Sequence, residues 1–184
     1  YYVRRMSSTA KANEQEEQQL LQLTAKIPFD DRVNHHATIQ DLSLAHIRIF
    51  LQDVKSDLFE SATKIPFEDL VRVMQIARGS SEYLRPVNVG LLFFSETTEK
   101  FFPYTQIEVT IYHDDIGDSF SEKVFKGPIH KQLRDALAHI KTLVIEEHVQ
   151  KVDGQAEAIR YYNYPFEAVE EALANAVYHK NYEE

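Results

Sequence analysis

The chain has 184 residues and a formal net charge of −9, with 43% hydrophobic and 27% charged residues. This balance is typical of a globular protein with one core, or with one domain and part of another. The absence of cysteine excludes disulfides and thiolate metal sites. The acidic charge disfavours a stand-alone duplex-binding surface, because such a surface needs clustered lysine and arginine. With five glycines and no G-x-x-x-x-G-K-[ST] pattern, the sequence predicts no glycine-rich phosphate loop.

The start of the chain and its hydropathy bear on its origin. The sequence begins with a β-rich stretch at Tyr1, and no signal peptide is visible. The longest apolar run, 89–94, is too short to cross a membrane. We therefore expect an internal piece of a larger cytoplasmic protein that has no contact with a membrane.

The first part of the chain predicts mainly helices. Residues 1–13, YYVRRMSSTAKAN, indicate a strand and a loop whose arginines and hydroxyls could contact phosphate, although a solvated edge strand is the simpler interpretation. Thr38 followed by Asp41 is a helix-start signal. Helices are predicted over 14–26, 38–55 and 66–77, with a linker over 56–63.

Two short segments leave alternatives open. The apolar stretch 85–95, RPVNVGLLFFS, is either a short buried helix or a buried strand, and Pro86 with Asn88 favours the helix. The neighbouring histidines His35 and His36 point in different directions on either kind of element. They therefore make a poor metal chelate without further ligands.

The second part predicts strands interspersed with helices. Residues 106–113, QIEVTIYH, alternate between apolar and polar, which indicates a strand. The acidic stretch 113–119 fits a turn with Gly117 at positive φ better than a calcium loop. The remaining predicted elements are a pairing strand over 120–126, a helix over 128–148, a hairpin over 150–162 around Asp153-Gly154, and a final helix from Pro165. This order predicts an α+β fold, in which N-terminal helices precede a small antiparallel sheet packed by a long helix and a C-terminal helix.

The final helix carries two different faces. Its apolar stripe consists of Val169, Leu173, Ala176 and Val177. Glu171, Asn175 and His179 follow one another at four-residue steps and so form a polar line along another face. In a nucleotide hydrolase, such a glutamate can activate the attacking water, and an amide oxygen one turn away can bind Mg²⁺. The simpler interpretation is the wet face of an amphipathic helix.

The segment EEALANAVYHKNY (170–182), preceded by YP, resembles a segment of the RecG-related transcriptional regulators, which also carry an ATP-dependent DNA helicase label. These multidomain proteins join an AlbA-like (Schlafen-like) DNA-binding domain to a region similar to the GHKL-type ATPases, such as gyrase and MutL. The resemblance implies that Glu171 is the water-activating, catalytic carboxylate. It also implies that Asn175 is the Mg²⁺ ligand and that Asn175 and His179 contact the nucleotide, ATP. The family's usual H-R-D-Y ending reads HKNY here.

The resemblance extends over nearly the whole chain. YYVRRMSSTAKAN is similar to the end of the AlbA-like domain, RPVNVGLLFFSE to the family's P-T-N-x-G-L-L-L-F-G stretch, and FKGPIHKQLRDAL to its G-x-L-x-x-Q segment. It implies three parts: the end of the DNA-binding domain (1–13), a helical linker region (14–84) and the start of the ATPase-like domain (85–184). DNA would then be bound through the preceding domain, with little direct nucleic-acid contact from these residues, and the chain could form a homodimer.

Two functional interpretations follow. In the first, the chain connects a DNA-binding head to an ATP-binding module, works as a structural relay and is inactive alone. We then expect weak or no ATP binding by residues 1–184, because the further walls of an ATP pocket would come from other residues. In the second, the chain is a self-contained metal-dependent hydrolase that uses Glu146, Glu147, His148 and Glu171.

Overall fold

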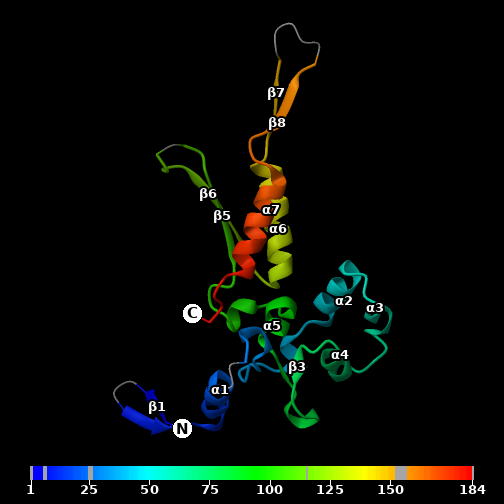
Figure 1. Ribbon diagram of the computed structural model, residues 1–184, viewed down its shortest axis with the longest axis vertical. Helices are drawn as coiled ribbons and strands as arrows, with labels where there is room; N and C mark the ends of the chain where they lie inside the picture. The colour runs from blue at the N-terminus through cyan, green and yellow to red at the C-terminus, as the bar shows by residue number, and fades with distance from the viewer. Residues whose placement is uncertain (1, 6–7, 25–26, 115, 152–156, 184) are drawn as a thin grey trace. The chain divides into compact units, whose positions relative to one another are not determined.

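The computed structural model describes residues 2–5, 8–24, 27–114, 116–151 and 157–183 (Figure 1). They divide into two compact units, Tyr1–Glu96 and Thr97–Glu184. Across the described residues, helices are combined with two-stranded antiparallel sheets. The α+β fold class predicted from the sequence is therefore confirmed. No helix in these ranges combines the length and the apolar character that crossing a membrane requires.

The first unit is mainly helical. A β-hairpin precedes its first helix, and a second, very short hairpin precedes its last one. Its elements are β1 (Tyr2–Arg5), β2 (Ser8–Lys11), α1 (Glu14–Thr24), α2 (Leu44–Asp53), α3 (Leu58–Ser61), α4 (Phe67–Val73), β3 (Ala77–Arg78), β4 (Arg85–Pro86) and α5 (Asn88–Phe94). The chain from 85 to 95 is therefore a short helix entered through a two-residue strand, and the helix interpretation is confirmed.

Helix α5 is the centre of the first unit. Leu91 is fully buried, and it belongs to the same core as Ile47 of α2 and Leu70 of α4. Asn88, at the start of α5, is also buried, but its Nδ2 donates to the carbonyl of Phe29 at 2.9 Å. This bond satisfies the amide, since burying an unpaired polar group would cost stability. The apolar sequence around residue 90 is thus explained by burial.

Helix α2 begins later than the sequence predicts. Thr38 and Asp41 do form a reciprocal capping box, but they cap a separate 3₁₀ turn, η2 (Ile39–Asp41). Ser43 then adopts an extended conformation, and its N–H donates to the carbonyl of Phe94 at 2.8 Å. A partner far along the chain thus holds this residue outside the helix. The prediction of one continuous helix over 38–55 is wrong, and the predicted linker contains α3.

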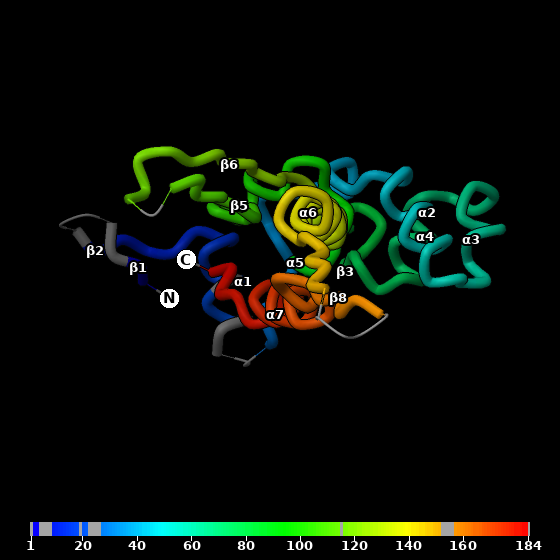
Figure 2. The backbone as a smooth tube through the Cα atoms, turned by 90° about the horizontal axis from the view of Figure 1, so that it is seen from above, coloured from blue at the N-terminus to red at the C-terminus, as the bar shows by residue number. Residues whose placement is uncertain are grey.

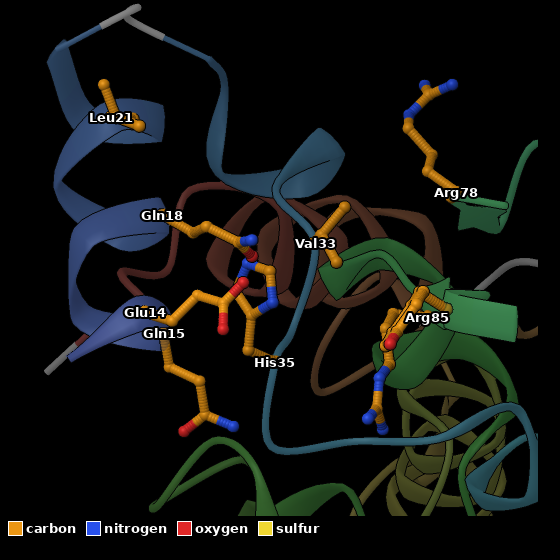
Figure 3. Close-up of a pocket in the computed structure, with 10 residues that line it drawn as sticks. Glu14, Gln15, Gln18, Leu21, Val33, His35, Arg78 and Arg85 are labelled. Atoms are coloured by element: carbon orange, nitrogen blue, oxygen red, sulfur yellow. The ribbon is translucent and has the colours of Figure 1, made fainter.

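An open groove lies on the first unit, beside α1. Figure 3 shows side chains of α1 on one side, the β3–β4 hairpin on the other, and His35 between them. The groove has a volume of about 780 Å³. Its lining residues are Glu14, Gln15, Gln18, Leu21, Val33, His35, Arg78, Gly79, Tyr83 and Arg85.

In the part of the second unit that the structure describes, two hairpins are combined with two helices. Strand β5 pairs with β6 from Ile107↔Phe125 to Tyr112↔Phe120. Helices α6 and α7 lie side by side in both views, and α6 also contacts the β5–β6 hairpin (Figures 1 and 2). The elements are β5 (Ile107–Tyr112), β6 (Phe120–Phe125), α6 (Ile129–Leu143), β7 (Glu147–Gln150), β8 (Ile159–Tyr162) and α7 (Phe166–Tyr178).

The two predicted hairpins are present. Gly117 has a φ of +81°, as the turn interpretation of the acidic stretch requires. The carboxylate of Asp114 accepts N–H groups from Gly117 at 2.6 Å and from Ser119 at 2.8 Å, so it caps its own turn. The pairing of β7 with β8 confirms the second hairpin, although its predicted Asp153-Gly154 turn lies outside the described residues.

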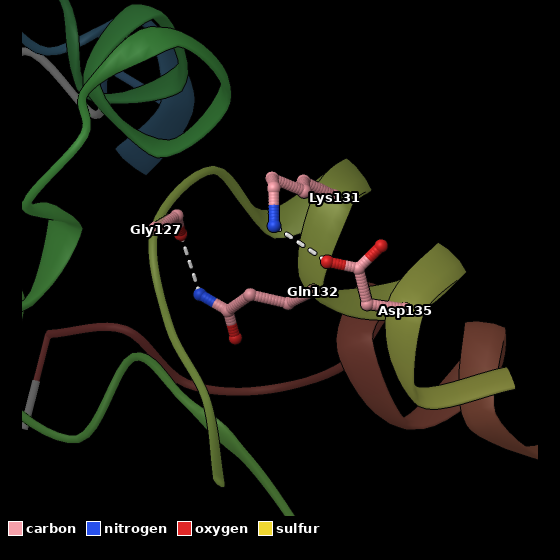
Figure 4. Close-up of polar contacts among 4 residues, drawn as sticks. All are labelled: Gly127, Lys131, Gln132 and Asp135. Atoms are coloured by element: carbon pink, nitrogen blue, oxygen red, sulfur yellow. Dashed lines mark hydrogen bonds and ion pairs between the residues drawn. The ribbon is translucent and has the colours of Figure 1, made fainter. Parts of the chain in front are cut away.

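A buried polar cluster holds the start of α6. Gln132 is 2% exposed, and its Nε2 donates to the carbonyl of Gly127 at 2.6 Å (Figure 4) and to that of Thr105 at 3.1 Å. The hydroxyl of Thr98, in the 3₁₀ turn η4 (Thr98–Lys100), donates to the same Gly127 carbonyl at 3.0 Å. Gln132 and the Gly127 carbonyl together thus join η4, the segment at Thr105 and the start of α6.

Candidate functional site

Helix α7 carries the residues that the sequence singles out. Pro165 precedes it, where the absent N–H costs nothing, and Glu167 lies in the first turn, near the positive end of the helix dipole. One side of the helix is half-buried against its surroundings. The half-buried residues are Phe166, Val169, Leu173, Ala174 and Val177, so Ala174 takes the place predicted for Ala176. Lys141 of α6 lies over the Phe166 ring, 4.8 Å from its centroid.

The predicted polar line lies on the exposed side of α7. Glu171, Asn175 and His179 are all exposed. Helical geometry persists to the end of the line, because the His179 N–H donates to the Asn175 carbonyl at 2.9 Å. The His179 ring packs edge-on against Tyr178, with centroids 5.0 Å apart. All three side chains are therefore held at four-residue steps and are open to a ligand.

The chain after α7 folds back onto the second unit. Lys180 Nζ donates to the carbonyl of Tyr104 at 2.6 Å, and Tyr104 adopts a left-handed conformation with a φ of +68°. The Tyr182 hydroxyl donates to the Val177 carbonyl at 2.8 Å. The Lys180 ammonium also lies 5.8 Å from the centroid of the Tyr182 ring. Together, Lys180 and Tyr182 hold the C-terminal end of α7 against the turn that precedes β5; we call this pair the latch.

Asn163 holds the other end of α7. Its Oδ1 accepts the N–H groups of Glu146 and Tyr164, both at 2.9 Å, and its Nδ2 donates to the Val144 carbonyl at 2.7 Å. One side chain thus joins the end of α6 to the start of α7. It also borders an open groove of about 740 Å³ between β5, α6 and α7. No motif in the sequence marks Asn163, whose local signal is its position before Tyr164-Pro165.

Replacing Asn163 with alanine is expected to loosen this junction. The substitution removes three hydrogen bonds at an exposed position, which should reduce local stability by about 1–2 kcal/mol. Native-state amide exchange should show faster exchange in β7, β8 and the first turn of α7. Asn163→Asp keeps the acceptor and loses the donor, so its effect should be intermediate. Unchanged exchange in the alanine variant would show that the junction is held by other contacts.

The residues of the hydrolase interpretation have separate structural contacts. Glu147 forms an ion pair with Arg160 at 3.1 Å. His148 stacks on Tyr161 with centroids 5.4 Å apart, and it follows Glu147 directly in β7, so the two side chains point to opposite faces. Within the described ranges, no group of three or more histidine and carboxylate side chains is arranged to hold a metal. No contact of these residues specifically favours hydrolysis.

Comparisons of the chain with family models, with curated proteins and with solved structures find no match.

Proposed function

We propose that the chain is a connecting region of a multidomain, DNA-binding transcriptional regulator of the RecG-related type. In this proposal it joins a DNA-binding head to an ATP-binding module in a cytoplasmic protein. Its work is to hold the two together and to relay the nucleotide state, and the acidic chain itself makes little contact with DNA. ATP with Mg²⁺ is the cofactor of the larger protein, whose ATPase activity depends on further residues.

The observation that carries the proposal is the exposed polar line of α7. A carboxylate and an amide one turn apart are the groups that water activation and Mg²⁺ binding require. Glu171 and Asn175 are exposed, while other residues of the same helix pack. In this arrangement Glu171 acts as the general base, Asn175 supplies an oxygen ligand to Mg²⁺, and His179 borders the nucleotide.

The roles of Glu171 and Asn175 can be separated in a longer chain that contains both neighbouring domains. Glu171→Ala should retain Mg-ATP binding and lose hydrolysis by about 10²-fold or more, because it removes only the general base. Asn175→Ala should weaken the binding of Mg-ATP itself. Binding is measured by calorimetry and turnover by phosphate release.

Glu170→Ala is the matched control, since Glu170 is also exposed on α7 but lies off the polar line. Glu170→Ala should change neither the affinity for Mg-ATP nor the rate of hydrolysis. Unchanged turnover in Glu171→Ala would remove this residue from the role of base. In the proposal, residues outside 1–184 complete the ATP pocket. Tight Mg-ATP binding by residues 1–184 alone would contradict this.

A further inference from the structure

We propose that the open groove on the first unit binds a ligand through an oxyanion, a carboxylate or a phosphate, and that Arg85 is the anchor for this group. The groove is bordered by α1, by the segment that carries Val33 and His35, and by the β3–β4 hairpin. It belongs to the first unit alone and is independent of the polar line on α7. The proposal therefore stands apart from the proposed function.

The groove has the size and the lining of a small-ligand site. Its volume of about 780 Å³ lies within the range usual for ligand pockets, roughly 300–1,000 Å³. Leu21, Val33 and Tyr83 offer apolar and aromatic surface for the body of a ligand. Gln15 and Gln18 offer amides from the α1 side. Such a mixture of apolar surface with a few polar groups is typical of ligand pockets.

The two arginines of the groove differ in their contacts. Arg78 forms an ion pair with Asp31, and in Figure 3 its side chain points away from His35. Arg85 is half-buried, and its Nη1 donates to the Ala37 carbonyl at 2.8 Å. Among the described residues, no carboxylate forms an ion pair with Arg85. Its guanidinium therefore carries a positive charge and further N–H donors that a carboxylate or phosphate could accept in a forked arrangement.

An anion bound by Arg85 would also interact electrostatically with His35, because the charge of Arg85 already acts on this imidazole. Partial burial lowers the pKa of His35 below 6.5, and the positive charges of Arg85 and His36 lower it further. The imidazole is therefore neutral at pH 7 and does not compete with Arg85 for an anion. An oxyanion held by Arg85 would offset the repulsion from the guanidinium, so the pKa of His35 should rise when the ligand binds.

The charges around the groove also restrict the ligand. Glu14 is an exposed carboxylate on the α1 side, opposite the hairpin that carries Arg85. A ligand with negative charge at both ends would be repelled there. A suitable ligand has one anionic end and a neutral or basic remainder. Its anionic end would bind Arg85, and the remainder would lie against α1. We therefore expect preference for a singly anchored anion over a polyanion.

The whole chain can be titrated with three probes that share a ring: benzoate, phenyl phosphate and uncharged benzyl alcohol. Amide and histidine NMR signals should show saturable shifts at groove residues with one or both anions and not with the alcohol. The titration midpoint of His35 should rise in the presence of benzoate. The tighter of the two anions identifies the preferred group, and equal affinity would indicate a general oxyanion site.

Variants locate the anchor. Arg85→Gln should weaken anion binding by about tenfold or more, as expected for the loss of charge-assisted hydrogen bonds. Arg48→Gln makes the same charge change in the same unit, at a residue that lies over the Phe59 ring and outside the groove, and should change affinity by less than about twofold. Gln18→Glu adds a negative charge at an exposed position of α1 and should also weaken binding, which keeps the test valid if Arg85→Gln does not fold.

Three results would overturn the proposal. The first is the absence of saturable shifts at groove residues with both anions at millimolar concentration. The second is equal binding of benzyl alcohol. The third is equal loss of affinity in Arg48→Gln and in Arg85→Gln, or, if the latter does not fold, unchanged affinity in Gln18→Glu.

Discussion

Replacing Gln132 with leucine is expected to destabilise the second unit by about 2 kcal/mol or more. The side chain is 2% exposed and donates to two carbonyl groups, those of Gly127 and Thr105. Leucine has a similar volume but no donor. The Thr105 carbonyl would lose the donor that Gln132 provides, and an unsatisfied buried acceptor costs about 1–3 kcal/mol. The Gly127 carbonyl would keep the Thr98 hydroxyl.

Native-state amide exchange measures this loss unit by unit. The free energy of opening should fall in α6 and β5 and remain unchanged in α5, because α5 belongs to the other compact unit. Lys131→Ala is the matched control: it removes an exposed i,i+4 ion pair with Asp135 next to Gln132, for which less than about 0.5 kcal/mol is expected. An equal effect of the two variants would show that the buried hydrogen bonds of Gln132 contribute nothing beyond a surface contact.

Replacing Gly90 with alanine is expected to destabilise the first unit by about 1–3 kcal/mol, although alanine is the better helix former. A Cβ at this position would lie 2.7 Å from the Ile76 carbonyl oxygen and 3.1 Å from the Ile76 Cβ. The same carbonyl accepts the Val87 N–H at 3.0 Å. Because the nearest atom belongs to the backbone, α5 has to move away from the chain before β3, and this hydrogen bond is strained.

The expected loss is observable as a lower free energy of opening for the amides of α5. Val73→Ala in α4 serves as the control, since Val73 is 58% exposed and its truncation should change stability by less than about 0.5 kcal/mol. A stabilising effect of Gly90→Ala would contradict this prediction. It would show that the higher helix propensity of alanine outweighs the steric clash of its Cβ with the Ile76 carbonyl.

The sequence patterns correctly predicted the elements that are stabilised by interactions between residues close in the chain. The alternation in Ile107–Tyr112 correctly predicted β5, since each half-buried residue is followed by an exposed one. The acidic turn was also predicted correctly, because Asp114 closes it with bonds to residues a few positions away. The five-residue spacing between Gly127 and Gln132 also has a physical reason. The Gln132 side chain donates a hydrogen bond to the Gly127 carbonyl.

Contacts between distant residues explain what the sequence could not predict. The apolar periodicity predicts a helix to about residue 148, but α6 ends at Leu143, after which the Val144 carbonyl accepts a hydrogen bond from Asn163. The start of α2 depends similarly on the bond from Ser43 to Phe94. For the candidate site, the polar line followed from spacing alone. The contacts that hold both ends of α7 depend on distant partners that no periodicity reveals.

The latch also has a consequence for the order in which the second unit folds. Lys180 and Tyr104 are 76 positions apart. The entropy cost of closing a loop grows with its length, and contacts between distant residues form after local ones. The β5–β6 hairpin needs only a short turn and can form early, while the latch can close only when most of the unit is already compact. We therefore expect the direction in which α7 presents Glu171 and Asn175 to be fixed late in folding.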